Sequence, residues 1–209
     1  MIVVVKESGP VYTNGYLVYN ENESNAVIIV APMGLWDQIS DFVANANLNI
    51  IAILITHSHW DHTVDCHLIS NITKAPVYVH QEDIYRISNP MQHTILKLPF
   101  EIDAVDNPIP IHDNDELKFG NLNFKVIHTP GHTEGGVCYV NYQEKIIFSG
   151  DTIFKNSIGR TDLPGGSRNK LLDSIRTKII NLPMEFSIYS GHGPVTTVGR
   201  ELSQNPFLT

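Results

Sequence analysis

The sequence predicts an α/β fold in which β-sheets are flanked by helices. Short apolar runs rich in β-branched residues alternate with segments whose apolar residues recur at helical spacing, and this alternation is typical of layered α/β folds. The most apolar run, at 50–55, reads IIAILI and is typical of a strand buried on both faces. The length of 209 residues suits one domain spanning 1–209, without linkers or repeats.

In the first half of the chain, turn signals separate the expected strands and helices. We expect strands at 2–5, 15–19 and 26–30, with turns at 9–10, 14–15 and 21–25. Apolar residues at helical spacing predict a helix over 35–47, before the central strand. A second helix is expected over 61–71, with Asp61 near its N-terminus and Val64, Leu68 and Ile69 facing inward. A short strand at 76–80 and a short helix at 81–88 follow.

The second half begins with a segment, 89–116, that we expect to be irregular because prolines stand at positions 90, 99, 108 and 110. A strand is expected at 122–127, followed by a hairpin formed by 137–141 and 145–148. Apolar spacing predicts a helix over 168–182, with Ser167 as its N-cap. The last expected strand is 187–189.

Composition and charge exclude several classes of protein. The net charge is −8 and no cluster of basic residues occurs, which argues against binding to nucleic acid or to an anionic membrane. No apolar stretch reaches the ~18 residues of a membrane span. Two cysteines do not form a disulfide framework, and no signal peptide is recognisable at the N-terminus. We therefore expect a cytoplasmic protein.

A cluster of metal-ligating residues follows the central strand directly. Thr56 ends the apolar run, and His57, His59, Asp61 and His62 follow within six residues. Imidazoles and carboxylates are the ligands that zinc and similar divalent metals prefer. In an extended loop His57 and His59 project to the same side, whereas Asp61 and His62 face a second point. The alternative, a polar turn that happens to be rich in histidine, explains this dense pattern poorly.

Three more strand ends carry a polar residue beside glycine, namely His132, Asp151 and His192. Ligands of α/β folds gather at strand ends, and glycine allows the backbone to approach closely. Five histidines and two aspartates suffice for two metal sites if one carboxylate bridges them. Asp151 is the natural bridge because it stands alone between His132 and His192.

Four motifs resemble those of the metallo-β-lactamase superfamily, and in particular the short, single-domain glyoxalase II-like (hydroxyacylglutathione hydrolase-like) hydrolases. They are THSHWDH at 56–62, TPGHT at 129–133, SGDTIF at 149–154 and GHGP at 191–194. GRTDLPGGS at 159–167 and NPFL at 205–208 narrow the resemblance. It implies an αββα sandwich, with two mixed β-sheets flanked by helices and a dinuclear site on one edge. It also implies His57, His59 and His132 on the first metal, Asp61, His62 and His192 on the second, and Asp151 on both.

The sequence departs from the family pattern in two places. The family has an Asp-Pro-Gly turn after the third strand, whereas this chain has Ala31, Pro32, Met33 and Gly34. We expect altered support around the metal ligands rather than loss of metal. We also expect no C-terminal helical domain of the kind that binds glutathione in full-length glyoxalase II enzymes, so the sequence leaves the identity of the thiol open.

The resemblance implies hydrolysis of a thioester, such as S-lactoylglutathione or a related acyl-glutathione, by a hydroxide that bridges two metal ions. Zinc is expected, with iron or manganese as alternatives because the ligand set suits all three. Asp61 and Asp151 are the expected catalytic residues, Asp61 as a ligand that also orients the hydroxide. Four residues are expected to contact the substrate: Arg160, Lys155, Asn156 and Arg168. We expect a small-molecule partner, and a monomer or weak homodimer.

Other activities remain open from the sequence. A mononuclear iron persulfide dioxygenase shares the HxHxDH cluster and a GRTD stretch, but the GHGP motif favours the hydrolase. The acidic balance disfavours a superfamily nuclease, and a scaffold with a structural metal is the non-enzymatic alternative. A true β-lactamase is disfavoured because position 62 is His and no cysteine lies near Asp151.

The remaining histidines and both cysteines are expected to have structural roles. We assign five histidines to packing or surface roles: His67, His80, His93, His112 and His128. Cys66 and Cys138 are expected to pack as small apolar residues. Trp60 is expected either to shape the pocket wall or to cover the core.

Overall fold

The computed structural model describes residues 1–208 and consists of two β-sheets packed face to face between helices. The first sheet contains six strands in sequential order: β1 (Ile2–Ser8), β2 (Thr13–Tyr19), β3 (Asn25–Ile29), β4 (Asn49–Leu54), β5 (Val77–His80) and β6 (Ile109–Ile111). Strands β1 to β3 are antiparallel, whereas β3 to β6 are parallel. This sheet is therefore mixed.

The second sheet also has six strands, in the order β14 (Thr196–Thr197), β13 (Ser187–Ser190), β10 (Ile146–Gly150), β9 (Val137–Asn141), β8 (Leu122–His128) and β7 (Glu116–Phe119). Strands β10 and β13 are parallel and the other neighbours are antiparallel. A two-stranded hairpin, β11 (Ile153–Phe154) with β12 (Ser157–Ile158), follows β10. Both sheets are mixed, as the sequence predicts.

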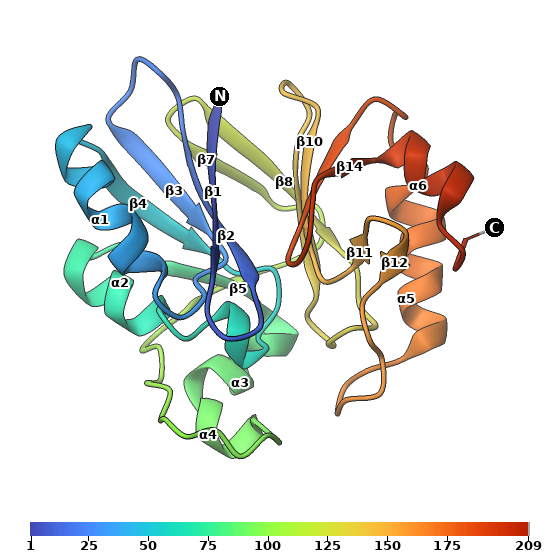
Figure 1. Ribbon diagram of the computed structural model, residues 1–209, viewed down its shortest axis with the longest axis horizontal. Helices are drawn as coiled ribbons and strands as arrows, with labels where there is room; N and C mark the ends of the chain where they lie inside the picture. The colour runs from blue at the N-terminus through green and yellow to red at the C-terminus, as the bar shows by residue number, and fades with distance from the viewer. Residues whose placement is uncertain (209) are drawn as a thin grey trace.

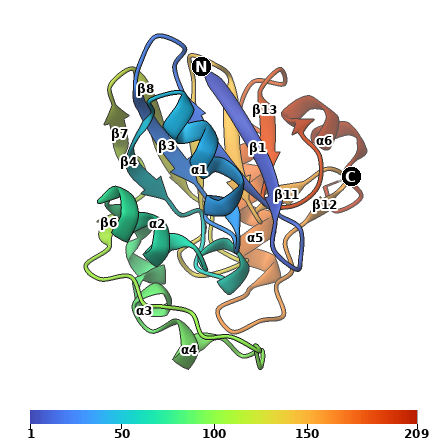
Figure 2. The same ribbon diagram turned by 60° about the vertical axis from the view of Figure 1, so that its left-hand side comes forward.

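Helices cover the outer face of each sheet (Figure 1). On one side lie α1 (Leu35–Asn45) and α2 (Cys66–Thr73), and on the other lie α5 (Arg168–Ser174), which continues as a π-helical turn over Ile175–Ile179, and α6 (Val198–Gln204). Two short helices, α3 (Ile84–Ser88) and α4 (Pro90–His93), lie together at one end of the molecule (Figure 2). Within residues 1–208, none of the helices has the length and hydropathy that crossing a bilayer would require.

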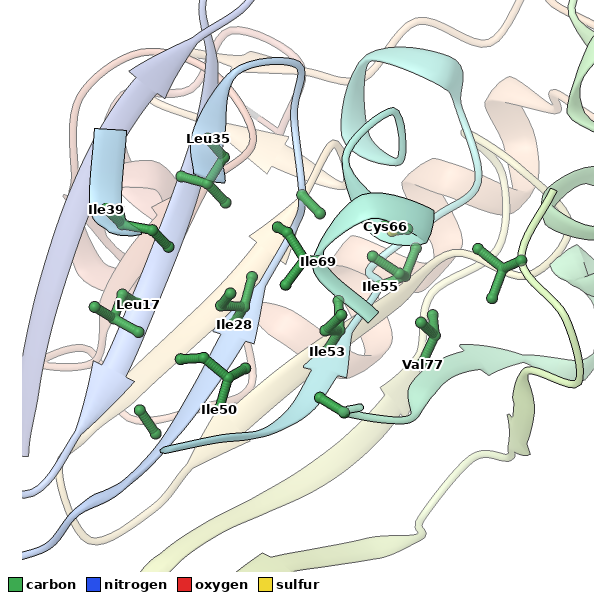
Figure 3. Close-up of a cluster of buried hydrophobic side chains, with 14 of the residues drawn as sticks. Leu17, Ile28, Leu35, Ile39, Ile50, Ile53, Ile55, Cys66, Ile69 and Val77 are labelled. Atoms are coloured by element: carbon green, nitrogen blue, oxygen red, sulfur yellow. The ribbon is translucent and has the colours of Figure 1, made fainter. Parts of the chain in front are cut away.

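Three hydrophobic cores fill the spaces between these layers. Alternation along β2 illustrates the arrangement, because Leu17 packs toward α1 and α2 whereas Tyr16 and Val18 pack between the sheets. Figure 3 shows the first of these cores, where Leu35 and Ile69 from the helices meet strand side chains. A third core lies between the second sheet and α5. The three cores confirm the expected αββα sandwich.

The structure corrects the expected N-terminal turn. The turn lies before Thr13, so Asn14 and Gly15 belong to β2 rather than to a turn. The reason is tertiary contact: the Asn14 side chain donates to the carbonyl oxygens of Ser190 and Gly193, at 3.0 and 2.9 Å. Gly15 packs against Leu35, where a β-carbon would lie 2.8 Å from a leucine methyl group. These contacts override the local turn preference of Asn-Gly.

The helix expected over 61–71 was also placed too early. Residues Trp60–His62 form a 3₁₀ turn, and α2 begins only at Cys66. Asp65, just before α2, accepts hydrogen bonds from the backbone of Gly34 and Trp36, and this contact fixes the start of the helix. Leu68 is 44% exposed rather than inward, whereas Ile69 is buried as expected.

The segment 89–116 contains more regular structure than the prolines suggested. It holds α4 and β6, and β7 begins at its end. Pro110 lies in β6, an edge strand of the first sheet, where a missing backbone N–H is tolerated. The sequence analysis also missed the short elements β11, β12, β14 and α6. Cys66 and Cys138 are fully buried and pack as expected.

Candidate metal centre

Loops from both sheets bring the seven expected ligands together. His57, His59, Asp61 and His62 follow β4 of the first sheet. The other three follow strands of the second sheet: His132 after β8, Asp151 after β10 and His192 after β13. The β4 strand is buried on both faces, so it fixes the position of the loop that it precedes. The loops converge at one edge of the sandwich.

Three imidazoles form the first group of potential ligands. The Nε2 atom of His132 lies 3.1 Å from His57 Nε2 and 2.8 Å from His59 Nδ1. His57 is 1% exposed and His132 is 4% exposed. Three nitrogen atoms directed at one point in this way can hold a divalent metal ion.

A second group combines one carboxylate with two imidazoles. Asp61 Oδ2 lies 3.2 Å from His62 Nε2 and 3.3 Å from His192 Nε2. Asp151 reaches both groups, because Oδ1 is 3.4 Å from His62 Nε2 and Oδ2 is 3.5 Å from His132 Nε2. The position of Asp151 between the two groups is the position a bridging carboxylate requires.

Buried polar atoms without partners support a metal at this point. Among the described residues, both ring nitrogens of His62 and the Oδ1 atom of Asp151 are shielded from solvent and make no hydrogen bond; Nε2 and Oδ1 are in ion-pair contact, at 3.4 Å. A buried nitrogen without a hydrogen bond, such as His62 Nδ1, costs about 1–3 kcal/mol. The nitrogen and carboxylate donors of these two groups fit divalent metal ions such as zinc, iron or manganese.

Burial and neighbouring charges set the protonation states of the site. Burial lowers the pKa of His57 well below its usual range, and burial together with His132 lowers the pKa of His59 to about 3. Burial opposes the charge of His62, but Asp61 and Asp151 outweigh it and raise the pKa of His62 to about 10. Burial works against ionisation of Asp151, yet the charge of His62 keeps the pKa of this carboxyl below its usual range. His57 and His59 are therefore neutral, which is the form of imidazole that binds a metal ion.

Backbone carbonyls orient two of the imidazoles. His132 Nδ1 donates to the carbonyl oxygen of Arg160 at 2.7 Å, and His192 Nδ1 donates to that of Tyr12 at 3.3 Å. A proton fixed on Nδ1 leaves the Nε2 lone pair free and directed at the centre of the site. Both Nε2 atoms point to the groups described above.

Asp83 holds two ligand loops together, and the sequence analysis missed it. This fully buried carboxylate accepts three hydrogen bonds on Oδ2, from Ser58 N, Ser58 Oγ and Thr133 Oγ1, at 2.8–2.9 Å. Its Oδ1 accepts from Gly135 N at 2.8 Å and from Arg86 at 3.3 Å. Ser58 lies between two ligand histidines and Thr133 follows a third. Asp83 thus ties the loop after β4 to the loop after β8.

Ala31 stands where the resemblance led us to expect a carboxylate. Its backbone N–H donates to His62 O at 2.9 Å and its carbonyl accepts from Asp65 N at 3.0 Å. Asp65 supplies a carboxylate to this turn, but its oxygens bond Gly34 N and Trp36 N. Among the described residues, His62 Nδ1 has no hydrogen-bond partner.

A pocket of about 240 Å³ opens over the site, with Asp61, Asp151 and three ligand histidines in its lining. Its apolar walls include Val11, Trp60, Pro90, Ile95, Leu96 and Leu163. Trp60 also contacts Phe100, with ring centroids 5.9 Å apart, so it shapes the pocket wall. His93 lines the pocket as well, although its sequence context gave no sign of this.

The four expected substrate contacts lie in different surroundings. Arg160 lines the pocket, where it forms a two-pronged ion pair with Asp162 at 2.8 and 2.7 Å. Lys155 and Asn156 are exposed in the turn between β11 and β12, and Asn156 N donates to Glu201. Arg168 stacks over the Phe207 ring at 5.6 Å. The last three are not among the residues that line the pocket.

Comparison with known proteins finds relatives that match this chain over most of its length. A family model described as the metallo-beta-lactamase superfamily matches residues 8–192. The probable metallo-hydrolase YqgX of Bacillus subtilis is 33% identical, over 96% of this chain and 94% of its own length. The hydroxyacylglutathione hydrolase GloC of Haemophilus influenzae is 34% identical, over 90% of this chain and 89% of its own.

Two solved structures have the same fold. The BLEG-1 B3 metallo-beta-lactamase superimposes with a TM-score of 0.91 at 36% identity, covering all of both chains. TTHA1623, solved in a di-iron-bound form, superimposes with a TM-score of 0.80 at 32% identity, covering 99% of this chain and all of its own. The fold is therefore shared over essentially the whole chain.

Proposed function

The chain belongs to the metallo-beta-lactamase superfamily, and from this premise we propose that it is a metal-dependent hydrolase of thioesters, with an acyl-glutathione such as S-lactoylglutathione as substrate. The convergence of seven imidazole and carboxylate side chains, five of which line one pocket, carries the proposal. The similarity to the hydroxyacylglutathione hydrolase of Haemophilus influenzae supports the choice of thioester.

The donor set suits two divalent ions, and we propose zinc. His57, His59 and His132 would hold one ion, and Asp61, His62 and His192 the other, with Asp151 shared between them. Iron is the alternative, because the similar protein TTHA1623 has been solved with two iron ions. When bound, such ions lower the pKa of a water to about 7 and polarise the carbonyl oxygen of a substrate.

The side chains of the site divide the remaining work. Asp61 lines the pocket and accepts a hydrogen bond from Thr13 Oγ1 at 3.0 Å, which restrains its carboxylate. From this position it can accept a hydrogen bond from the attacking water and orient it. Asp151 holds the two ligand groups in register. A thiol leaves readily because its pKa is only ~8.5, so the chain needs no dedicated general acid.

Arg160 is the residue proposed to contact the substrate. It lines the pocket, and its guanidinium is 59% exposed, so it can reach a substrate carboxylate at the pocket mouth. Asp162 competes for the same guanidinium, and a bound carboxylate would have to share or displace that partner. The contact is therefore a modest contribution to affinity.

The test combines metal content with hydrolysis of S-lactoylglutathione. We expect two divalent ions per chain and a loss of activity of at least about a hundredfold in His59→Ala. His112→Ala is the matched control, since His112 is exposed and is not part of the pocket lining. One iron per chain with oxygen uptake and no hydrolysis would instead identify a persulfide dioxygenase. Cleavage of RNA would identify a nuclease.

Hydrolysis of a β-lactam amide is a second candidate. The observation that favours it is the 36% identity with the BLEG-1 B3 metallo-beta-lactamase over the whole chain. An assay with nitrocefin alongside the thioester separates the two candidates. A larger kcat/KM for nitrocefin than for S-lactoylglutathione would make the β-lactam the preferred substrate and overturn our first choice.

A further inference from the structure

The mouth of the pocket is unusually rich in exposed apolar side chains. Val11, Ile95 and Leu96 all line the pocket, yet they are 43%, 61% and 53% exposed. Met91, in the same segment as Ile95 and Leu96, is 45% exposed. Exposed apolar residues that gather at one opening mark a binding surface, whereas single ones are ordinary.

The two arginines that line the pocket both form ion pairs with carboxylates. Arg86 donates to Asp83 and Glu134, at 3.3 and 2.5 Å, and to the carbonyl oxygen of Pro164. Arg160 is paired with Asp162 through two hydrogen bonds. No other lysine or arginine belongs to the described lining of the pocket. A charged group placed against the segment 94–96 would therefore lose water, and both arginines of the lining already have a carboxylate partner.

The two observations point to a substrate with one apolar arm. Building on the proposed thioesterase function, we propose that the acyl group is an apolar chain, longer and less polar than lactoyl, which packs against Val11, Ile95 and Leu96. The thiol part then extends toward Arg160, the one guanidinium at the mouth that is mostly exposed. The chain would select its substrate by the length of the acyl group.

The first test is a series of acyl-glutathiones that share one thiol and one charge. We expect kcat/KM to rise from S-lactoyl- through S-butanoyl- to S-hexanoylglutathione, by about two- to fourfold for each added methylene that is buried. Equal or falling values along the series in the unmodified protein would overturn the proposal.

Substitutions test whether the apolar side chains at the pocket mouth cause the dependence of kcat/KM on acyl length. Ile95→Asp should abolish the dependence on chain length. Ile72→Asp should preserve it, because Ile72 is also a mostly exposed isoleucine (52%, against 61% for Ile95) but lies on α2 and is not part of the pocket lining. The same chain-length dependence in both variants would contradict a role for Ile95.

Binding measurements test the apolar acyl-binding surface independently of the proposed thioesterase function. Calorimetry with S-methyl- and S-hexylglutathione, which cannot be hydrolysed, should show a roughly tenfold or greater preference for the hexyl compound. Tighter hexyl binding without hydrolysis of any thioester would retain the apolar wall and reject the proposed function. Hydrolysis of all thioesters at one rate, with equal binding of both thioethers, would retain the proposed thioesterase function and reject the apolar binding surface.

Discussion

A single buried carboxylate decides how the ligand histidines are held. Asp83 accepts five hydrogen bonds, and two of its partners, Ser58 and Thr133, are neighbours of ligands in sequence. Removal of this carboxylate would take one of two carboxylates from buried Arg86 and leave it Glu134 and the carbonyl oxygen of Pro164. Asp83 is neither one of the potential metal ligands nor part of the pocket lining, so it acts on the site through the loops it joins.

Replacement of Asp83 should weaken both the fold and one metal site. We expect Asp83→Ala to lower the free energy of unfolding by about 3–5 kcal/mol, because it leaves several buried donors without an acceptor and removes one of the two carboxylates that pair with buried Arg86. Metal content should fall from two ions toward one, since the loops carrying His57, His59 and His132 lose their common anchor. Denaturant unfolding and metal analysis check both effects.

Asp41→Ala is the control for this prediction, because Asp41 is exposed on α1. It should change stability by no more than about 0.5 kcal/mol and leave the metal content intact. A destabilised Asp83→Ala variant that still binds two ions with unchanged affinity would show that Asp83 supports the fold and not the site.

At the scale of elements, the turn after β13 must pass very close to the ligands. A β-carbon at Gly191 would collide with Asp151 Oδ1 and lie 2.5 Å from a ring carbon of His62. Gly191→Ala should therefore displace Asp151 and lower metal affinity by at least about tenfold while the sheets remain folded. Competition with a coloured chelator measures the affinity, and circular dichroism reports the fold.

Gly193→Ala, two residues later, distinguishes the effect of a collision with the metal ligands from the effect of backbone strain in the turn. Gly193 has a φ of +72°, but a β-carbon there would have no atom within 4 Å. Alanine should cost about 1–2 kcal/mol of stability through the backbone alone and leave metal affinity unchanged. Equal losses of metal affinity in the two variants would mean that the turn itself, and not contact with Asp151, controls the site.

The elements also show where prediction from the sequence works and where it stops. The strand ends that carry His57, His132 and Asp151 were predictable because each residue follows an apolar run closely and stands directly after a threonine or a glycine. Asp83 was not, since it follows a short strand in the stretch HQED, which is typical of an exposed helix start. Its partners are 25 and 50 residues away, so only the fold reveals them.

Local preference failed where distant contacts replaced it. Asn14 and Gly15 have a strong turn signal, yet hydrogen bonds to the turn after β13 keep them in β2. Lys155 and Arg168 are near Arg160 in sequence, but hairpin β11–β12 and the start of α5 carry them away from the pocket lining. Sequence proximity to a motif is thus weaker evidence for a site than position at a strand end.

At the scale of the whole molecule, the site joins the two sheets. The first sheet contributes the loop after β4, and the second contributes the loops after β8, β10 and β13. Direct approaches cross between them, as between His57 Nε2 and His132 Nε2 at 3.1 Å and between His62 Nε2 and Asp151 Oδ1 at 3.4 Å. A metal ion held by both sets is a cross-link between the halves of the sandwich.

Removal of metal should therefore destabilise the whole fold and not only the loops. A ligand present at 100 times its Kd stabilises the folded state by about 2.7 kcal/mol, which corresponds to a decrease in Tm of roughly 5–10 °C on chelation for a chain of this size. Calorimetry with and without EDTA measures the change, and added zinc should restore the original Tm. The triple variant His59→Ala, His62→Ala, Asp151→Asn is the control, because it removes ligands from both groups and a chain that cannot hold the ions should have the same Tm with and without EDTA. A chelator effect of equal size in that variant would show that the ions stabilise the fold from somewhere other than the junction of the two sheets.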